Sequence, residues 1–330
     1  MNRRRRVVVA AGLVPLSLPL VGLTQPAQGV RRIGFLSLSK AGNAVDQQGA
    51  SMLRDSLQGS GWVEGRNLAI ERRYAEGDAN RLDGLAKELV DRKVELILAV
   101  LTTPTAAAKR ATSNIPIVML GAISPVELGF VQSLARPGGN VTGTASPGLD
   151  TAAKSIQILR EVAPNLTRLA MVSNPTNPAG QTFNETRIRT ANLLGMTAEV
   201  IAVSQPDDIP AALERIVGSR AQMLLVNNDG AILPRLGEFT SFAIQHKILS
   251  IGTATVFTTV GGALYYGSNL QELIDRTVSY IDRILRGAKP ADLPIEQPTN
   301  FDLIVNLKTM RAIGIAVPQS ILVRATEVIQ

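Results

Sequence analysis

Short apolar segments alternate with longer amphipathic segments along most of the chain. The apolar segments are rich in branched aliphatic residues and comprise Arg32–Leu38, Asn67–Arg73, Val94–Leu101, Ile115–Gly121, Arg168–Ser173, Thr197–Val203, Ala221–Val226 and Ile248–Gly252. The segments with helical spacing are Ala44–Ser60, Ala79–Arg92, Thr103–Thr112, Asp150–Val162, Asn177–Leu194, Asp207–Ser219 and Ile232–His246. Nearly continuous apolar strands joined by helices predict parallel sheets covered on both faces, which is a doubly wound α/β fold.

One further helix is predicted near the end of the chain. Its apolar face is formed by Leu270, Leu273, Ile274, Thr277, Val278, Ile281, Ile284 and Leu285. Asn269 precedes this face and Glu272 follows three residues later, which is a capping pair. Gly287 and Pro290 then end the helix.

The length of the chain favours two units. It has 330 residues, more than one typical core accommodates. A glycine-rich stretch, Arg136–Gly143, separates one strand–helix series from a second that begins after Asp150. We therefore predict two Rossmann-like lobes of similar size.

The N-terminus has the layout of an export signal. Arg3–Arg6 is followed by the uncharged apolar run Val7–Leu23, and small residues lead to Gly29. Pro15 and Pro19 interrupt the run, which is too short for a stable membrane span. We predict that residues 1–29 direct export to the periplasm by the general or the twin-arginine route; an uncleaved anchor is the alternative.

Composition excludes several classes of site and partner. The chain has no cysteine, which removes thiolate nucleophiles, cysteine metal sites and the lipidated cysteine of a lipoprotein. Its one histidine, His246, ends a predicted helix and has no catalytic partners in sequence. Without the four N-terminal arginines, 30 basic against 27 acidic residues leave a modest charge of +3. Only 4% of residues are aromatic, and no basic cluster indicates nucleic-acid binding.

Five stretches resemble a known family: Gly61–Leu68 (GWVEGRNL), Ile115–Met119 (IPIVM), Ser133–Gly143 (SLARPGGNVTG), Lys289–Phe301 (KPADLPIEQPTNF) and Asn306–Thr309 (NLKT). They are similar to those of the exported substrate-binding proteins of ABC transporters, a family that includes tryptophan- and tyrosine-binding members. The likeness extends over nearly all of residues 31–330.

The resemblance implies the type I periplasmic binding protein fold, in which three crossing segments join two lobes around a ligand cleft. The expected lobes are residues 30–142 plus about 262–295, and residues 143–261 plus about 296–330. The expected crossings are Val141–Ala145, the region near Ala254–Tyr265 and the region near Pro294–Phe301. The resemblance also implies a small-molecule ligand and an ABC permease in the inner membrane as partners. We expect a monomer that needs no cofactor or metal and binds no nucleic acid.

The carboxyl ends of parallel strands are where ligands of such folds collect. Thr102 and Thr103 follow one apolar strand, and we expect Thr103 to be the N-cap of a helix whose first residue is Pro104. The start of this helix then offers free N–H groups to a ligand carboxylate. The alternative is that both threonines only end and cap their own elements.

Other strand ends supply further candidates. Ser37 and Ser39 follow the first strand, and Ser124 follows the fourth at a position where the family often has an acid. Asn174 and Asn177 belong to an Asn-Pro turn that resembles the family's, with ordinary turn chemistry as the alternative.

Asp229 follows a buried strand in the second lobe. A carboxylate there, facing the helix start across a closing cleft, would bind the ammonium group of an amino acid; capping of the following helix is the alternative. Tyr265 and Tyr266 follow a Gly-Gly pair, and strand alternation predicts that only one faces the cleft. Tyr265 is the candidate for an aromatic wall of the cleft, and packing at the hinge is the alternative.

We therefore predict a solute-binding protein and not an enzyme, since no acid/base pair or phosphate loop is present in the sequence. An amino acid or related carboxylate is the expected ligand, with sugars second. A sensing module for a membrane signalling receptor is the alternative function, and a secreted α/β enzyme is the third.

Overall fold

The computed structural model describes residues 29–42, 44–146, 149–177 and 180–330. The predicted export signal lies outside these ranges except for Gly29. Within them, no helix combines the length and the apolar character that a membrane crossing needs.

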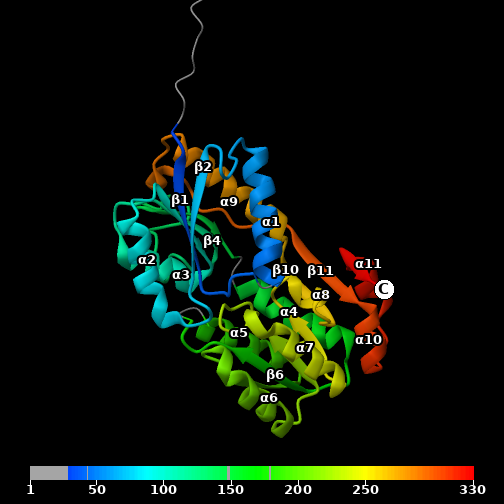
Figure 1. Cartoon of the computed structure of the whole chain (residues 1–330). Helices are drawn as coiled ribbons and strands as arrows, with labels where there is room; N and C mark the ends of the chain where they lie inside the picture. The colour runs from blue at the N-terminus through cyan, green and yellow to red at the C-terminus, as the bar shows by residue number, and fades with distance from the viewer. Residues whose placement is uncertain (1–28, 43, 147–148, 178–179) are drawn as a thin grey trace, which may run out of the picture.

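The first lobe is built on an all-parallel sheet of five strands. In spatial order these are β2 (Leu68–Tyr74), β1 (Arg31–Ser37), β3 (Leu96–Val100), β4 (Ile117–Ala122) and β5 (Val141–Ala145). Helices α1 (Ala44–Gly59) and α9 (Leu270–Leu285) cover one face, and α2 (Leu82–Asp91) and α3 (Thr102–Ala111) cover the other (Figure 1). Strands β1, β3, β4 and β5 are thus mostly buried between helices, and the edge strand β2 is partly exposed.

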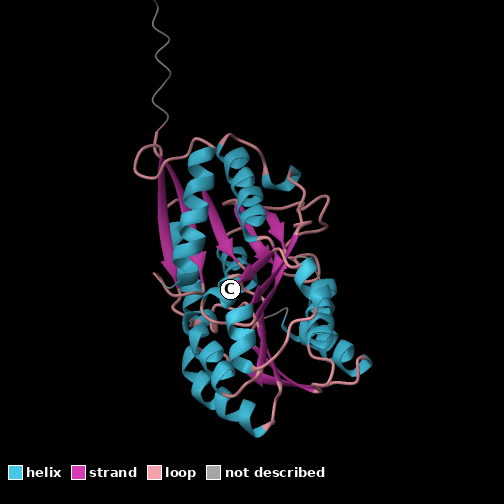
Figure 2. Ribbon diagram, turned by 90° about the vertical axis from the view of Figure 1, so that its right-hand side faces the viewer, coloured by secondary structure: helices cyan, strands magenta, loops and turns pink. Residues whose placement is uncertain are grey.

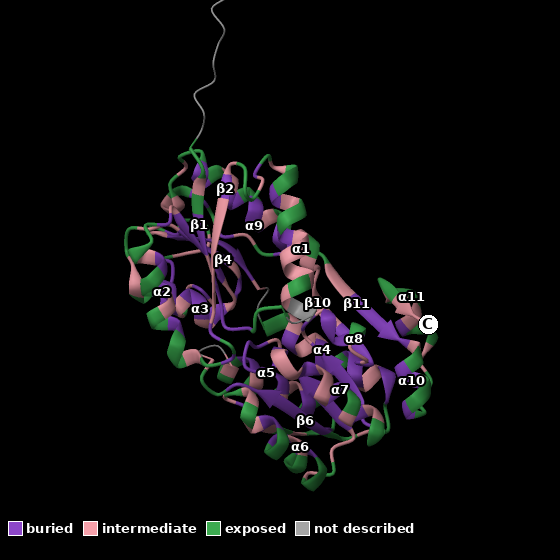
Figure 3. Cartoon of the chain, viewed as in Figure 1, coloured by how far each residue is buried: buried purple, intermediate pink, exposed green. Residues whose placement is uncertain are grey.

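The second lobe contains a sheet of seven strands. In spatial order these are β12 (Glu327–Ile329), β11 (Phe301–Asn306), β10 (Leu264–Ser268), β9 (Leu249–Gly252), β8 (Met223–Val226), β6 (Arg168–Ser173) and β7 (Thr197–Ala202). One face is covered by α4 (Leu149–Val162), α5 (Gly180–Leu193) and α11 (Gln319–Arg324), and α10 (Leu307–Ile313) adds to the same core. The other face is covered by α6 (Ile209–Gly218), α7 (Leu236–Gln245) and α8 (Val256–Thr259). Figure 2 shows the two sheets one above the other, and Figure 3 shows that their strands are mostly buried.

The eight predicted strands and the predicted helices are all present, and the α/β fold with parallel sheets in two lobes is confirmed. The Asn269 cap of α9 is also confirmed, because its side chain accepts a hydrogen bond of 2.9 Å from Glu272 N. The antiparallel pairing of β10 with β11 was not expected. It arises because β10 leads out of the second lobe and β11 leads back into it.

The chain passes between the lobes three times. The first and third passages lie at or next to the expected segments, and the second does not. The first passage lies after β5, which belongs to the first sheet, so residues 143–145 are in the first lobe. The second lies at Asn269, between β10 and α9, and the expected region Ala254–Tyr265 is instead inside the second lobe. The third lies within Pro294–Phe301, where Glu296 still bridges to Thr144 of β5.

Two of these crossing segments are joined by Glu272 at the start of α9. Asn269 N donates to Asn300 O at 3.0 Å, and the Glu272 carboxylate accepts from the N–H groups of Thr299 and Asn300. Arg276 forms an ion pair of 2.8 Å with the same carboxylate. Burial by itself would raise the pKa of Glu272, but the hydrogen bonds from Arg276, Thr299 and Asn300 outweigh it and hold the pKa below its usual range.

Glu272→Gln should lower the free energy of unfolding at neutral pH by roughly 1–2 kcal/mol, because hydrogen bonds to the charged group are lost. A carboxylate whose pKa is lowered by folding stabilises the protein above its unfolded pKa, near 4.3, and this contribution is lost as the pH falls through the folded pKa. The difference between wild type and variant should therefore shrink below about pH 4 in urea unfolding. Exposed Glu127→Gln is the control, and a difference that persists unchanged in acid would contradict the role given to the carboxylate.

Candidate functional site

The carboxyl ends of strands from both sheets meet at a cleft between the lobes. Its volume is about 260 Å³, and its lining is more apolar on the side of the first lobe. There it is formed by side chains such as Phe35, Leu53, Leu101 and Leu120. The second lobe contributes mainly amide, hydroxyl and charged side chains from the ends of β6, β8 and β9.

Seven of the nine predicted ligand-binding residues line this cleft. They are Ser37, Ser39, Thr103, Asn174, Asn177, Asp229 and Tyr265. The other two, Thr102 and Ser124, do not line it. Residues separated by more than two hundred positions in sequence, from Ser37 to Tyr265, are therefore brought together at one place, as expected for sheets whose strands end at a common cleft.

The start of α3 differs from the prediction. Leu101 is the N-cap rather than Thr103, and the helix begins at Thr102, which makes Pro104 its third residue. This position still suits proline, because the first N–H groups of a helix have no partner within it. Leu101 has φ 68° and ψ −173°, a conformation rarely adopted outside glycine, and it lies at the cleft.

The two neighbouring threonines have different environments. Thr102 is buried, and its hydroxyl accepts a hydrogen bond of 3.0 Å from Ile123 N, which joins α3 to the end of β4. Thr103 is half-buried at the cleft. Only Thr103 therefore offers its side chain to a ligand.

The serines of the first lobe also have distinct roles. Ser37 Oγ accepts from Ser39 N at 3.1 Å, so the two residues form a small turn at the end of β1 beside the cleft. Ser124 has φ 47°, and its carbonyl accepts from Leu128 N. It belongs to the turn after β4, of which Ile123 but not Ser124 lines the cleft.

Asp229 is a buried carboxylate of the cleft, with 3% of its surface exposed. Its carboxylate accepts hydrogen bonds of 2.9 Å each from Asn174 Nδ2, Asn177 Nδ2 and Ala231 N. All three donors are neutral, and no lysine or arginine of the described residues forms an ion pair with it. The contact with Ala231 N is turn chemistry, so Asp229 both shapes its own loop and lines the cleft.

Both tyrosines after the Gly-Gly pair contribute to the lining, although only one was expected. Tyr265 is buried and donates to Ser268 O at 2.7 Å, and burial raises the pKa of its hydroxyl. Tyr266 stacks on Phe301 with ring centroids 6.0 Å apart. The lining also includes Gly267 and Ser268, so the whole end of β10 borders the cleft and alternation does not select one tyrosine.

The most prominent residue that the sequence analysis missed is Arg187 in α5. It lines the cleft, and its Nη1 donates to Asn227 Oδ1 at 2.6 Å. A signal was present, since Phe183, Arg187 and Ala191 recur every four residues and all three are buried. An arginine on the buried stripe of a helix is uncommon and indicates a specific role. By contrast, no group of three or more His, Asp or Glu that could hold a metal occurs among the residues described.

The contrast between the threonines can be tested by substitution. Thr102→Val should lower the free energy of unfolding by roughly 1 kcal/mol, because Ile123 N–H loses its acceptor. Thr103→Val removes no such hydrogen bond and should leave unfolding within about 0.5 kcal/mol of wild type. Urea unfolding of both variants measures this, and equal losses would contradict the assignment of Thr102 to structure and Thr103 to the cleft.

Comparisons with known proteins agree with this architecture. Residues 41–329 match the family described as "ABC transporter substrate binding protein". The chain is 25% identical over 259 residues to a tyrosine-binding protein of Clostridioides difficile (strain R20291), covering 78% of this chain and 74% of that protein.

Two solved structures have the same fold. One is an ABC domain in complex with L-Trp from Streptococcus pneumonia, with 24% identity, a TM-score of 0.82 and coverage of 91% of this chain and 99% of the other. Another is a ligand-free, open substrate-binding protein from Clostridium difficile, with 23% identity, a TM-score of 0.62 and coverage of 91% and 100%. With the family match over most of its length, the chain belongs to the substrate-binding proteins of ABC transporters.

Proposed function

We propose that this protein captures an amino acid or a related carboxylate by closing its two lobes on it, and that it delivers the ligand to an ABC permease in the inner membrane. The observation that carries the proposal is the buried Asp229 carboxylate at the cleft, which has only neutral hydrogen-bond partners. A buried carboxylate is stabilised most by a cationic partner, which a ligand ammonium group supplies.

The cleft has the chemistry that an amino acid requires. Asp229 on the second lobe takes the ammonium group. The start of α3 on the first lobe, beside Thr103, has orphan N–H groups that favour a carboxylate. The apolar wall that includes Phe35 and Leu120 then covers the side chain. The relatives described as tyrosine-binding and as a complex with L-Trp support this ligand class.

Contacts between the lobes support closure as the mode of capture. Gly230, next to Asp229 in the second lobe, lies so close to Leu38 of the first lobe that a side-chain carbon at Gly230 would overlap it. On the same rim, a Cβ on Gly77 would lie 2.7 Å from the Pro206 ring across the cleft. Glycine thus permits a close approach of the lobes at the edge of the cleft.

Delivery and location complete the proposal. The family to which the chain belongs serves ABC transporters, and such delivery implies that the protein works outside the cytoplasm. The basic and apolar N-terminal pattern, residues 1–29, is typical of an export signal and agrees with a periplasmic location.

Ligand binding is tested by thermal unfolding against a panel of amino acids, small carboxylates, sugars and nucleosides, with protein refolded to remove co-purified ligand. A ligand that binds only the native state at about 100 times its Kd adds about 2.7 kcal/mol. We expect a saturable rise in Tm with amino acids or carboxylates. A protein that responds to none of the compounds, or that turns one over, would contradict the proposal.

Asp229→Asn should weaken binding of the responding amino acid by about 10-fold or more, because an amide has no charge to offer the ammonium group. The exposed Asp55→Asn is the matched control and should bind like wild type. Isothermal titration measures both affinities, and an unchanged Kd in Asp229→Asn would rule out the ammonium contact.

Gly230→Ala should weaken binding without lowering the Tm of the ligand-free protein, because the added methyl group would overlap Leu38 in the present arrangement and the proposed opening of the lobes would separate the two. Gly237→Ala in α7 is the control, since a Cβ there meets nothing within 4 Å. Small-angle X-ray scattering with and without ligand should show that wild type contracts and Gly230→Ala contracts less. Equal contraction in both proteins would argue against this contact as part of closure.

A further inference from the structure

Arg187 is a buried cation inside the ligand cleft. It lies in the second turn of α5, and only 4% of its surface is exposed although it lines the cleft. Side chains of a helix lean toward its N-terminus, and the N-terminus of α5 lies at the cleft beside Asn177. The guanidinium group is therefore carried back from the helix to the end of β8, where it meets Asn227.

The guanidinium group lacks the partner that such a group requires. Nη1 donates to Asn227 Oδ1, and the group lies 5.7 Å from the centre of the Phe183 ring. Nε is buried without any hydrogen-bond partner, and no described Asp or Glu pairs with Arg187. Burial lowers the pKa of Arg187 to about 10, so the group is still charged at neutral pH.

The nearby acid of the cleft does not compensate this charge. The Asp229 carboxylate is held by the amides of Asn174 and Asn177, while Arg187 is held by the amide of Asn227. One wall of the cleft thus carries a cation and an anion that are each bound to neutral groups and are not paired with each other. Burying an unpaired charge costs free energy, and the cost is recovered when a complementary charge arrives.

We propose that Arg187 binds an anionic group of the ligand, so that the ligand must carry a carboxylate that reaches the second lobe. This inference rests on the proposed function and makes it more specific. Arginine suits the task because its planar fork of N–H donors matches a carboxylate. The carboxylate comes from one of two sources: the α-carboxylate of an amino acid, which Arg187 would then bind in place of the start of α3, or a second carboxylate on the side chain of an acidic ligand.

The competing explanation is that Arg187 is a structural residue that only packs on Phe183 and anchors Asn227. A structural role predicts that its removal destabilises the protein and weakens all ligands equally. A role in binding the ligand predicts a loss confined to ligands with the carboxylate. The two explanations therefore differ in selectivity and not only in affinity.

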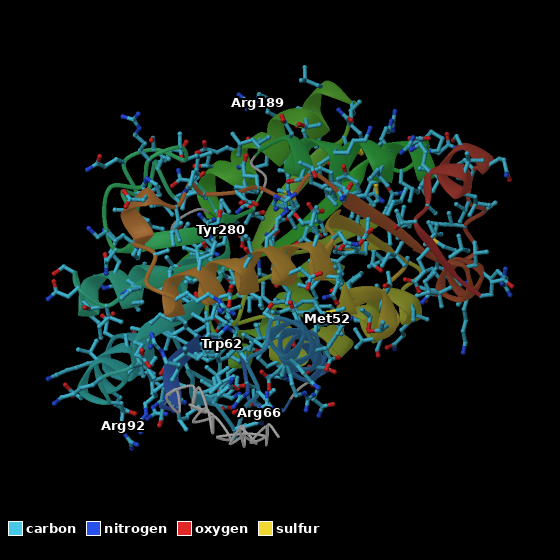
Figure 4. The ribbon with its side chains drawn as sticks, turned by 90° about the horizontal axis from the view of Figure 1, so that it is seen from above. Met52, Trp62, Arg66, Arg92, Arg189 and Tyr280 are labelled. Atoms are coloured by element: carbon cyan, nitrogen blue, oxygen red, sulfur yellow. The ribbon has the colours of Figure 1, made fainter. Side chains whose placement is uncertain are left out.

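The test compares Arg187→Met, Arg187→Lys and the matched control Arg189→Met. Arg189 is on the same helix but is exposed and lies at the outer edge of the molecule (Figure 4). Titrations use acids selected by the panel together with analogues that lack one carboxylate, such as L-tyrosine with tyramine, or L-glutamate with L-glutamine and 4-aminobutyrate. The Tm of each ligand-free protein verifies folding.

We expect Arg187→Met to bind the acid roughly 10- to 150-fold more weakly than wild type, the span that corresponds to one hydrogen bond to a charged group. Arg187→Lys should recover part of this loss and Arg189→Met should show none. The analogue without the relevant carboxylate should bind wild type and Arg187→Met equally. If this analogue is the decarboxylated amine, Arg187 binds the α-carboxylate. If it is the side-chain amide, Arg187 binds the side-chain carboxylate.

Several results would overturn the inference. One is an Arg187→Met protein that binds the acid as well as wild type, and another is equal weakening for the acid and its analogue. If Arg187→Met does not fold, the wild-type protein provides the test. Binding of the decarboxylated and amide analogues as tightly as the acid would then also overturn the inference. A wild-type protein that binds only sugars or nucleosides would overturn the role of Arg187 but not the proposed delivery of a ligand to the permease. A wild-type protein that binds none of the compounds would overturn both proposals.

Discussion

The buried Asp229 carboxylate is the interaction on which the geometry of the cleft depends. Its two oxygens accept from amides that follow β6 and from the backbone that follows β8, so they fix the ends of two neighbouring strands relative to each other. Because these neutral donors satisfy Asp229, it is not paired with Arg187. The second lobe therefore presents two separate charges to the cleft, at a cost in free energy that the proposed zwitterionic or acidic ligand would offset.

This arrangement connects recognition with closure. Gly230 follows Asp229 directly and contacts the first lobe through Leu38, so the residue pair that shapes the charged wall also sets how closely the lobes approach. Two of the three crossing segments are joined at Glu272, which ties the start of α9 to the segment that leads into β11. In the proposed mode of capture, ligand binding shifts the balance toward the closed form only through contacts that the open form lacks, and the apolar wall of the first lobe would supply them.

Much of this molecule could be predicted from the sequence, because strand and helix periods are local properties. The strand ends therefore identified most of the cleft, including Asp229 and Thr103. The predictions that were wrong concern features that depend on tertiary structure. The start of α3 depends on an unusual backbone at Leu101, and the second crossing on the pairing of β10 with β9. The spacing of Arg187 with Phe183 and Ala191 is visible in the sequence, but that its guanidinium group is buried with an unpartnered Nε is seen only in the structure.

A crystal structure of the protein with the acid that raises its Tm most would test the account most directly. We predict closed lobes, a ligand carboxylate oxygen within hydrogen-bond distance of Arg187 Nε, and a ligand ammonium group next to Asp229 when the ligand is an amino acid. A ligand held between the lobes that contacts neither Arg187 nor Asp229 would contradict the account of recognition. A ligand bound outside the cleft would contradict the account of capture as well.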